Sequence, residues 1–236
     1  MALESTGWHK LCQIATHHKN IMRSFLLLLL FSLSSAMSLP AQDDPKSKAV
    51  IDKLMAQART WKTFEADFSS RLQNGKDKLD VKQQGSMKVK GSKFRLVLDK
   101  NTIINDGKTL YTYSKESNEV TLSDPAEMDQ ELDPAKLVTQ FENGFKSQFV
   151  EERMENGVAT QVIKLFPADP AKKPYHTVIL AVDKAKTQPR SIQVLYKDGN
   201  SVTYALDRFN ANVELADDLF AFDKARYPGV EVNDMR

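Results

Sequence analysis

The sequence predicts an α+β fold, mostly β, in which one large antiparallel sheet curls toward a barrel and helices gather on one side of it. Two observations predict it. Much of the chain after residue 62 alternates apolar and polar residues with a period of two, as strands do. Turn sequences such as NGKDK, NDGK and KDGN separate these stretches, as in antiparallel hairpins. Ten to twelve strands in one sheet tend to curl, so we expect a concave apolar face.

The first 41 residues are expected to be a leader. Met22-Arg23 precedes the run SFLLLLLFSLSSA, and a charged start, an apolar middle and a small-residue end are the layout of a secretory signal peptide. The run is shorter than the roughly 20 apolar residues of a permanent transmembrane helix; an N-terminal membrane anchor is the alternative. We assign 1–21 to an upstream extension, 22–41 to the signal peptide and 42–236 to the exported domain, with cleavage after residue 36 or 41.

Export of this domain would leave few reactive side chains. Cys12 and three of the four histidines lie in the leader, so the domain keeps His176 and no cysteine. A Cys/His zinc site, a cysteine nucleophile and a disulfide are therefore excluded for it. The domain has 30 Lys+Arg and 30 Asp+Glu, because the leader holds three of the basic residues and one of the acidic residues. This balance does not predict nucleic-acid binding.

The domain is expected to begin with an amphipathic helix and to continue as strands. Asp44-Pro45 is a helix start with an acidic cap and a proline in the first turn. Apolar residues then recur at helical spacing as far as about Trp61. The expected strands are 64–72, 81–89, 94–98, two short strands flanking Asp106-Gly107, and 120–122, 148–155, 158–167, 174–183, 188–198, 200–209 and 219–222.

Residues 124–147 are expected to be a helical insertion in this sheet. Asp124-Pro125 and Asp133-Pro134 are two more starts of the cap-then-proline kind. An apolar stripe at helical spacing follows, made of Leu137, Val138, Phe141 and Phe145.

No catalytic constellation is recognisable, so we expect the protein not to be an enzyme and to hold no metal or cofactor. His176 stands alone in an expected strand, and the chain has no GxSxG elbow. The pairs Glu151-Glu152 and Asp217-Asp218 are adjacent in sequence, and adjacent residues of a strand point to opposite faces, which makes them poor acid–base partners.

Four segments in order resemble the LolA family of periplasmic outer-membrane lipoprotein carriers, whose receptor relatives share the fold. They are IDKLMAQARTWKTFEADFSSR at 51–71, QGSMKVKGSKFRLVL at 84–98, NDGKTLYTY at 105–113 and LFAFDKARYPGVEVND at 219–234. The resemblance implies an incomplete β-barrel with a helical lid over an apolar cavity. It also implies a monomeric periplasmic carrier that takes acylated lipoproteins from an inner-membrane ABC transporter to an outer-membrane receptor.

The residues expected to line this cavity alternate along the first strands, and ordinary core packing is the alternative for each. They are Phe68, Leu72, Met87, Val89, Phe94, Leu96, Leu98 and Leu110, with Leu137, Phe141 and Phe145 in the lid. Gly91-Ser92 stands where the family usually has an Arg-Pro pair. The resemblance implies that this arginine holds the lid to the sheet by hydrogen bonds. A second hypothesis is a periplasmic binding or sensor module of the same fold for another lipid or acylated ligand; a third, an envelope enzyme, lacks candidate residues.

The segment NDGKTLYTY raises a separate question, because its strand carries large side chains on both faces. We expect Leu110 in the cavity wall, and Tyr111 and Tyr113 at its rim, where a ring with a polar tip suits a half-wet position. A shift of one residue would reverse this assignment.

Overall fold

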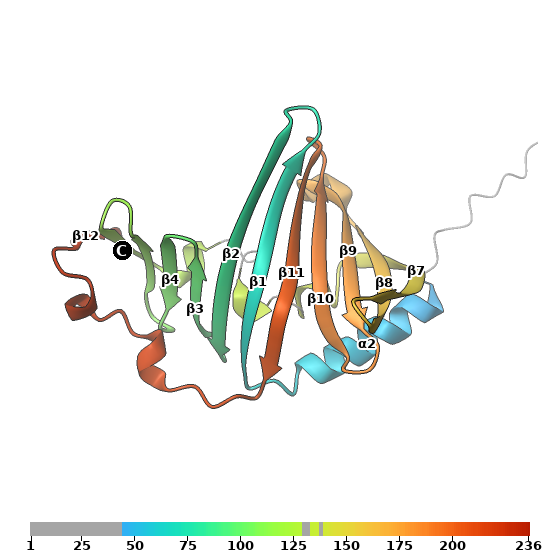
Figure 1. The fold of residues 1–236 in the computed structure, drawn as a ribbon, viewed down its shortest axis with the longest axis horizontal. Helices are drawn as coiled ribbons and strands as arrows, with labels where there is room; N and C mark the ends of the chain where they lie inside the picture. Colours follow the sequence, from blue (N-terminus) through green and yellow to red (C-terminus); the bar gives the residue numbers. More distant parts are fainter. Residues whose placement is uncertain (1–43, 129–132, 137–138) are drawn as a thin grey trace, which may run out of the picture. The chain divides into compact units, whose positions relative to one another are not determined.

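The computed structural model describes residues 44–128, 133–136 and 139–236 (Figure 1). The predicted leader lies outside these residues, and so do Leu137 and Val138 of the predicted lid. In the described part of the chain, no helix combines the length and the apolar character that a membrane span requires.

One α-helix and a twelve-stranded sheet make up the described domain. The helix is α2 (Pro45–Ala58). The strands are β1 (Thr63–Asn74), β2 (Leu79–Lys90), β3 (Lys93–Leu98), β4 (Asn101–Asn105), β5 (Leu110–Ser114), β6 (Glu119–Ser123), β7 (Phe145–Glu155), β8 (Val158–Pro167), β9 (Tyr175–Asp183), β10 (Gln188–Tyr196), β11 (Asn200–Ala211) and β12 (Glu231–Asp234).

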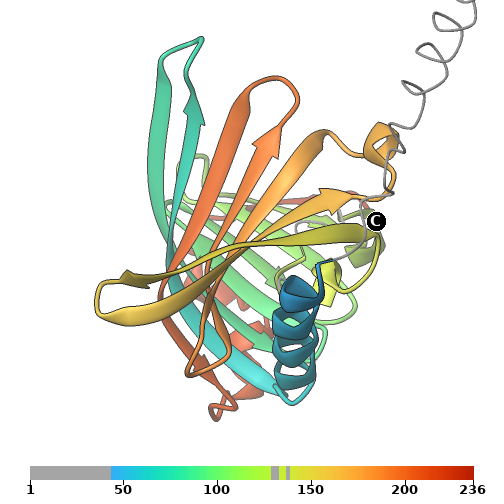
Figure 2. The same ribbon diagram turned by 90° about the vertical axis from the view of Figure 1, so that its right-hand side faces the viewer.

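The sheet confirms the predicted fold class. Its strand order is β12-β6-β5-β4-β3-β2-β1-β11-β10-β9-β8-β7, so β1 pairs with β11 and closes the two halves of the chain into one sheet. The neighbouring strands pair antiparallel except β12, which runs parallel to β6. Figure 2 shows the sheet curling, with α2 lying on the side toward which it curls.

Helix α2 is fixed to the sheet edge by its own N-cap. The Asp44 carboxylate accepts hydrogen bonds from the backbone N–H of Lys46 (3.0 Å) and from that of Phe149 in β7 (2.7 Å). These bonds, the Phe149 bond first, hold the pKa of Asp44 below its usual value. The predicted helix start is confirmed. The helix ends at Ala58, before Trp61, because residues 59–62 turn the chain into β1.

The predicted helical insertion at 124–147 is wrong for the described residues. They form three short 3₁₀ turns: η1 (Pro125–Glu127), η3 (Pro134–Lys136) and η4 (Thr139–Phe141). Asp124 caps η1 as expected, but a cap followed by proline starts a three-residue turn as readily as a helix. Phe145 is the first residue of β7 and not part of a helix. We call the described residues of 124–144 the lid segment.

The C-terminal segment packs on the convex face of β3–β6 and forms an apolar cluster there, which we call the convex-face cluster. The predicted strand at 219–222 is wrong: η6 (Asp217–Phe220) and η7 (Lys224–Arg226) occupy this region, and the last strand is β12. Phe222 stacks on Tyr111 (5.3 Å between ring centroids) and on Tyr227 (4.8 Å), and Tyr227 contacts Tyr113 (4.4 Å). The two tyrosines of β5 therefore lie under this segment and not at a cavity rim, whereas Leu110 faces the concave side.

Gly85 is required where β2 passes under an aromatic ring. A Cβ at this position would lie 2.5 Å from Cζ of Phe68 and 2.7 Å from the carbonyl oxygen of Val97. The carbonyl belongs to the backbone of β3 and cannot rotate away, so the strand itself would have to move.

Gly85→Ala is therefore expected to lower the free energy of unfolding by ~1–3 kcal/mol, the usual cost of overpacking. The measurement is urea unfolding followed by circular dichroism. Gly75→Ala is the control: among the described residues no atom lies within 4 Å of its added Cβ, and alanine there is expected to be neutral or to stabilise by up to ~1 kcal/mol. Equal stability of the Gly85 variant and the parent would contradict the packing argument.

Candidate functional site

The concave face of β1–β5 carries a contiguous apolar surface, which we call the inner wall. Directly paired residues share a face of the sheet. Phe64 and Ala66 of β1 lie opposite Val89 and Met87 of β2, which lie opposite Phe94 and Leu96 of β3. The inner wall consists of Phe64, Ala66, Phe68, Met87, Val89, Phe94 and Leu110, all buried, with Leu96, Leu98, Ile103, Met128, Ala135, Tyr204, Leu206 and Phe209 packed against them.

The structure brings together most of the residues predicted to line a cavity. Phe68, Met87, Val89, Phe94 and Leu110 are buried in the inner wall, and Leu96 and Leu98 are partly buried beside them. In this structure they pack against one another and against the lid segment, so contact with a ligand stays a prediction for each of them.

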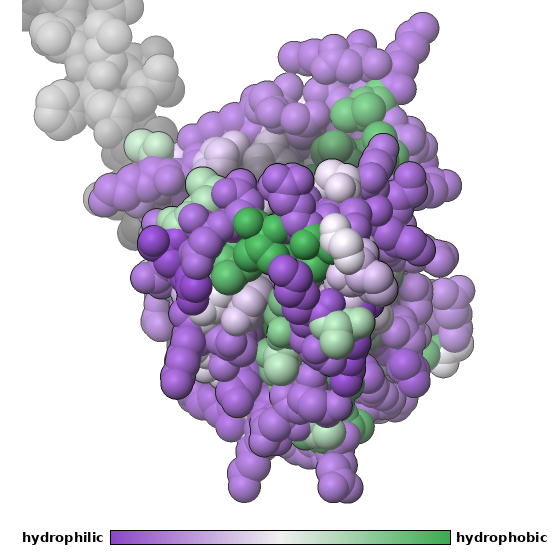
Figure 3. Space-filling view, turned by 90° about the vertical axis from the view of Figure 1, so that its left-hand side faces the viewer, coloured by the Kyte–Doolittle hydropathy of each residue, from purple (hydrophilic) through white to green (hydrophobic). Residues whose placement is uncertain are grey.

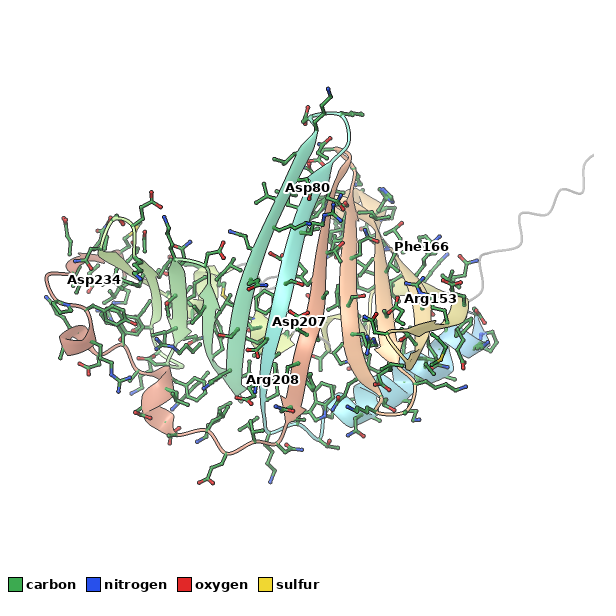
Figure 4. All side chains as sticks on the ribbon, viewed as in Figure 1. Asp80, Arg153, Phe166, Asp207, Arg208 and Asp234 are labelled. Carbon is green, nitrogen blue, oxygen red and sulfur yellow. The ribbon has the colours of Figure 1, made fainter. Side chains whose placement is uncertain are left out.

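Leu72 lies on the same face but outside the packed part of the inner wall. It pairs with Val81 of β2 and Val202 of β11 near the end of the sheet where β1 and β2 project farthest (Figure 1). Leu72 is half-buried, Leu79 is 38% exposed and Val81 is 43% exposed. Asp80 lies between them in sequence on the opposite face (Figure 4), where it pairs with Arg71 through two hydrogen bonds. The inner wall thus continues into apolar side chains that are only partly covered.

A separate apolar cluster lies beneath α2. It combines the buried face of the helix with the concave faces of β8–β10 and with Phe141 of the lid segment. Phe141 contacts Phe145 edge to face (5.7 Å between centroids), and Glu142 pairs with Arg59 at the end of α2. Of the predicted lid residues, Phe141 therefore belongs to the lid segment, Phe145 lies beneath it in β7, and Leu137 lies outside the described residues.

The lid segment crosses the concave face between these two clusters. Met128 and Ala135 pack on the inner wall, and η3 contacts β2 and β3. Its described helical parts are turns of three residues, whose hydrogen bonds are local. Met128, Ala135 and Phe141 pack it against the apolar side chains of the sheet and of α2. Seen from the β12 end, the surface is mostly hydrophilic, with apolar side chains in a central area and in a second area toward the upper right (Figure 3).

A small cavity lies where α2, the lid segment and the start of β1 meet. Its volume is about 60 Å³, and its lining includes Trp61, Gly91, Ala135 and Thr139. Trp61 packs on Phe209 (4.8 Å between centroids) and on Phe64 (6.4 Å). Gly91, which stands where the resemblance leads us to expect arginine, has a φ of 59° and begins the tight turn between β2 and β3.

Few polar groups on the concave face are set up for chemistry. Burial raises the pKa of the Tyr204 phenol, and the nearby Tyr196 raises it further. His176 is exposed, and its Nδ1 lies 2.9 Å from Oγ1 of Thr177. Within residues 44–128, 133–136 and 139–236, no group of three or more metal-ligating side chains is placed to hold a metal ion. The arrangement suits apolar binding better than acid–base work.

Several inner-wall residues were not predicted. Phe64 and Ala66 belong to the same alternation as Phe68, so the period-two pattern could have included them. Leu206 and Phe209 join the wall only because β11 pairs with β1, and no local signal fixes that pairing. Leu206 and Phe209 are three residues apart, yet both lie on the concave face. A bulge between the Asp67 and Phe68 pairs shifts the register and makes this possible. Asp207 and Arg208, which are labelled on β11 in Figure 4, are the two residues between Leu206 and Phe209 in the sequence.

A protein-family model described as outer membrane lipoprotein carrier protein LolA matches residues 59–223. The chain belongs to the LolA family. The match runs from the end of α2 through the sheet and lid segment to the convex-face cluster, so it includes every inner-wall residue.

Similar proteins include one named lipoprotein carrier and two uncharacterized proteins. An outer-membrane lipoprotein carrier protein of Glaesserella parasuis is 28% identical over 223 residues, which cover 92% of this chain and 98% of that protein. An uncharacterized protein of Methanocaldococcus jannaschii is 24% identical over 201 residues, 84% of this chain but only 57% of its own length. The crystal structure of an uncharacterized conserved protein from Thermus thermophilus shares the fold, with a TM-score of 0.53, 9% identity, and coverage of 80% of this chain and 99% of that one.

Proposed function

We propose that this protein is a periplasmic carrier that binds the acyl chains of lipoproteins on its inner wall and shuttles them from the inner to the outer membrane. The observation that carries the proposal is the continuity of the inner wall from a packed centre to the partly covered Leu72, Leu79 and Val81. Membership of the LolA family and the named Glaesserella relative support the lipoprotein as cargo.

The physical requirement for such a carrier follows from the cargo. Each buried methylene group of an acyl chain is worth about 0.8 kcal/mol, so exposed chains would not leave a membrane for water. A carrier must cover them and still release them. A lid segment that packs on the sheet through Met128, Ala135 and Phe141 can be displaced by an acyl chain that offers similar contacts. The partly covered end of the inner wall gives the methyl end of that acyl chain a place to begin.

The partners in this proposal are an inner-membrane ABC transporter that delivers the lipoprotein and an outer-membrane receptor that accepts it. The protein acts as a monomer and catalyses no reaction.

The second candidate is a periplasmic binding or sensor module for another lipid. The same apolar face supports it, because nothing in an apolar wall distinguishes one acyl chain from another.

A release assay tests the proposal. Inner-membrane vesicles that contain the transporter and radiolabelled lipoproteins are incubated with ATP and the purified protein. We expect lipoprotein in the supernatant in proportion to the protein added. Release no greater than with buffer would overturn the carrier function.

Mass spectrometry of lipid extracted from the purified protein distinguishes the two candidate functions. A free fatty acid or other lipid in place of an acylated peptide would favour the binding or sensor module.

Val81→Ser is expected to weaken binding of a fluorescent fatty-acid probe about threefold to tenfold. The side chain is 43% exposed, and its apolar surface would be covered by the ligand, which corresponds to ~0.7–1.4 kcal/mol. Val232→Ser is the matched control: Val232 is also 43% exposed, but it pairs with Val120 on the opposite face. Equal affinities of the two variants for the probe would show that its acyl chain does not lie along this end of the inner wall.

A further inference from the structure

The Trp61 indole is the only described aromatic side chain near the lid whose buried polar atom lacks a partner. Its Nε1–H is inaccessible to solvent and has no hydrogen-bond acceptor among the described residues. A buried donor without an acceptor destabilises the protein that contains it, so such a group in a folded protein calls for an explanation.

The position of the ring is fixed by its neighbours. Phe209 and Phe64 hold it through aromatic contacts, and Trp61 follows directly on the turn that ends α2, with its backbone N–H donating to the carbonyl of Ala58 (3.1 Å). The indole therefore cannot easily turn its N–H toward water, and an acceptor must come to it.

Trp61 also lines the cavity of about 60 Å³ beneath the lid segment. That volume exceeds the share of one water molecule in the liquid, roughly 30 Å³, so it can hold a small polar group. It is far too small for an acyl chain. Gly91 contributes further room, because among the described residues no atom lies within 4 Å of the position its Cβ would take.

The cavity lies at one end of the inner wall, and the partly covered Leu72 and Val81 lie toward the other. Phe64 lines the cavity, and from Phe64 to Leu72 strand β1 extends roughly 26 Å at ~3.3 Å per residue. A long acyl chain that runs along this path with its methyl end at Leu72 and Val81 would place the group that joins it to its head near Trp61, at the junction of α2 and the lid segment.

We infer that Trp61 Nε1–H is a hydrogen-bond donor to the ester or amide carbonyl that links an acyl chain to its head group. The inference rests on the proposed acyl-chain binding and adds a polar contact to it. It makes the site selective for carbonyl-linked chains over ether-linked chains of the same length, because only the former satisfy the buried donor.

The test compares dipalmitoylglycerol with its ether analogue, di-O-hexadecylglycerol, as competitors of the fluorescent fatty-acid probe. We expect the parent protein to bind the ester about five- to tenfold more tightly. Trp61→Phe keeps the aromatic ring and removes the donor, so it is expected to bind both compounds equally. Tyr113→Phe, the control, removes a side-chain donor from the convex face, where Tyr113 contacts Tyr227, and is expected to keep the preference for the ester.

Three outcomes overturn the inference while leaving acyl binding intact: equal affinities in the parent, a preference that persists in Trp61→Phe, or one that is lost in Tyr113→Phe as well. Failure of the probe to bind the parent would instead overturn the proposed function. If Trp61→Phe does not fold, NMR of the parent decides. The sequence has two tryptophans, and the Trp61 indole proton should move downfield with the ester only; a shift that is the same with both compounds overturns the inference.

Discussion

Replacing Phe94 by alanine is expected to lower the free energy of unfolding by ~3–5 kcal/mol, the range measured for loss of a buried phenylalanine. Phe94 is 0% exposed at the centre of the inner wall, opposite Val89 of β2 and Asn105 of β4. Its removal leaves a cavity that the paired strands on either side cannot collapse to fill. Since a domain of this kind is stable by only ~5–15 kcal/mol, the midpoint of urea unfolding should fall markedly.

Met154→Ala is the control for Phe94→Ala. Met154 is 67% exposed on the edge strand β7, and its truncation is expected to change stability by less than ~0.5 kcal/mol. A Phe94 variant as stable as the Met154 variant would mean that the inner wall is loosely packed throughout. In that case Phe94 would be a ligand contact and not a structural residue.

Phe220→Ala is expected to have an effect of the same size, ~3–5 kcal/mol, although this residue lies on the other face of the sheet. Phe220 is 0% exposed in η6, which contacts β3. The turn is also tied to the sheet by Lys90, whose ammonium lies 3.1 Å from the Asp217 carboxylate and holds the pKa of Asp217 below its usual value. Loss of the ring should loosen the whole C-terminal segment.

Hydrogen exchange distinguishes loosening of this segment from general destabilisation. Amides of 213–236 should exchange faster in Phe220→Ala, whereas Phe94→Ala should accelerate exchange in β2 and β3. Met235→Ala is the control, because Met235 lies in the same segment and is 63% exposed. Uniform acceleration across both faces in the Phe220 variant would contradict the separation of the two clusters. At temperatures where both variants are folded, Phe220→Ala should retain acyl binding.

The strands could be predicted from sequence because their signals are local. Alternation along 64–72 indicates which face of the sheet each side chain occupies, and the turn residues of each hairpin indicate where strands begin and end. Asp44-Pro45 likewise predicts the start of α2. The lid segment could not be predicted, because Asp-Pro pairs start short turns and helices alike. The final strand was misplaced because β12 depends on parallel pairing with β6, more than 100 residues earlier in the chain.

The candidate site shows the same division. Phe68, Met87 and Phe94 were identified because strands adjacent in sequence bring them together, whereas Phe209 depends on the pairing of β1 with β11. The tyrosines of β5 were assigned to the wrong environment. Their alternation correctly opposed them to Leu110, but nothing nearby in sequence indicated that Phe222 and Tyr227 would cover them. Which group lacks a hydrogen-bond partner, as Trp61 does, is a property of the packed structure alone.

The Asp44 carboxylate has a consequence for how copies of this protein meet. An open sheet can grow by accepting a strand from another molecule at its edge, and β7 is such an edge. Asp44 occupies the Phe149 amide there, and farther along the strand Glu151, Arg153 and Glu155 pair with one another. The N-cap of the helix that shields apolar side chains of the sheet thus also occupies backbone groups, the Ser147 carbonyl and the Phe149 amide, with which a neighbouring chain could pair. Helix α2 and its cap residue Asp44 thereby guard against two different routes to aggregation.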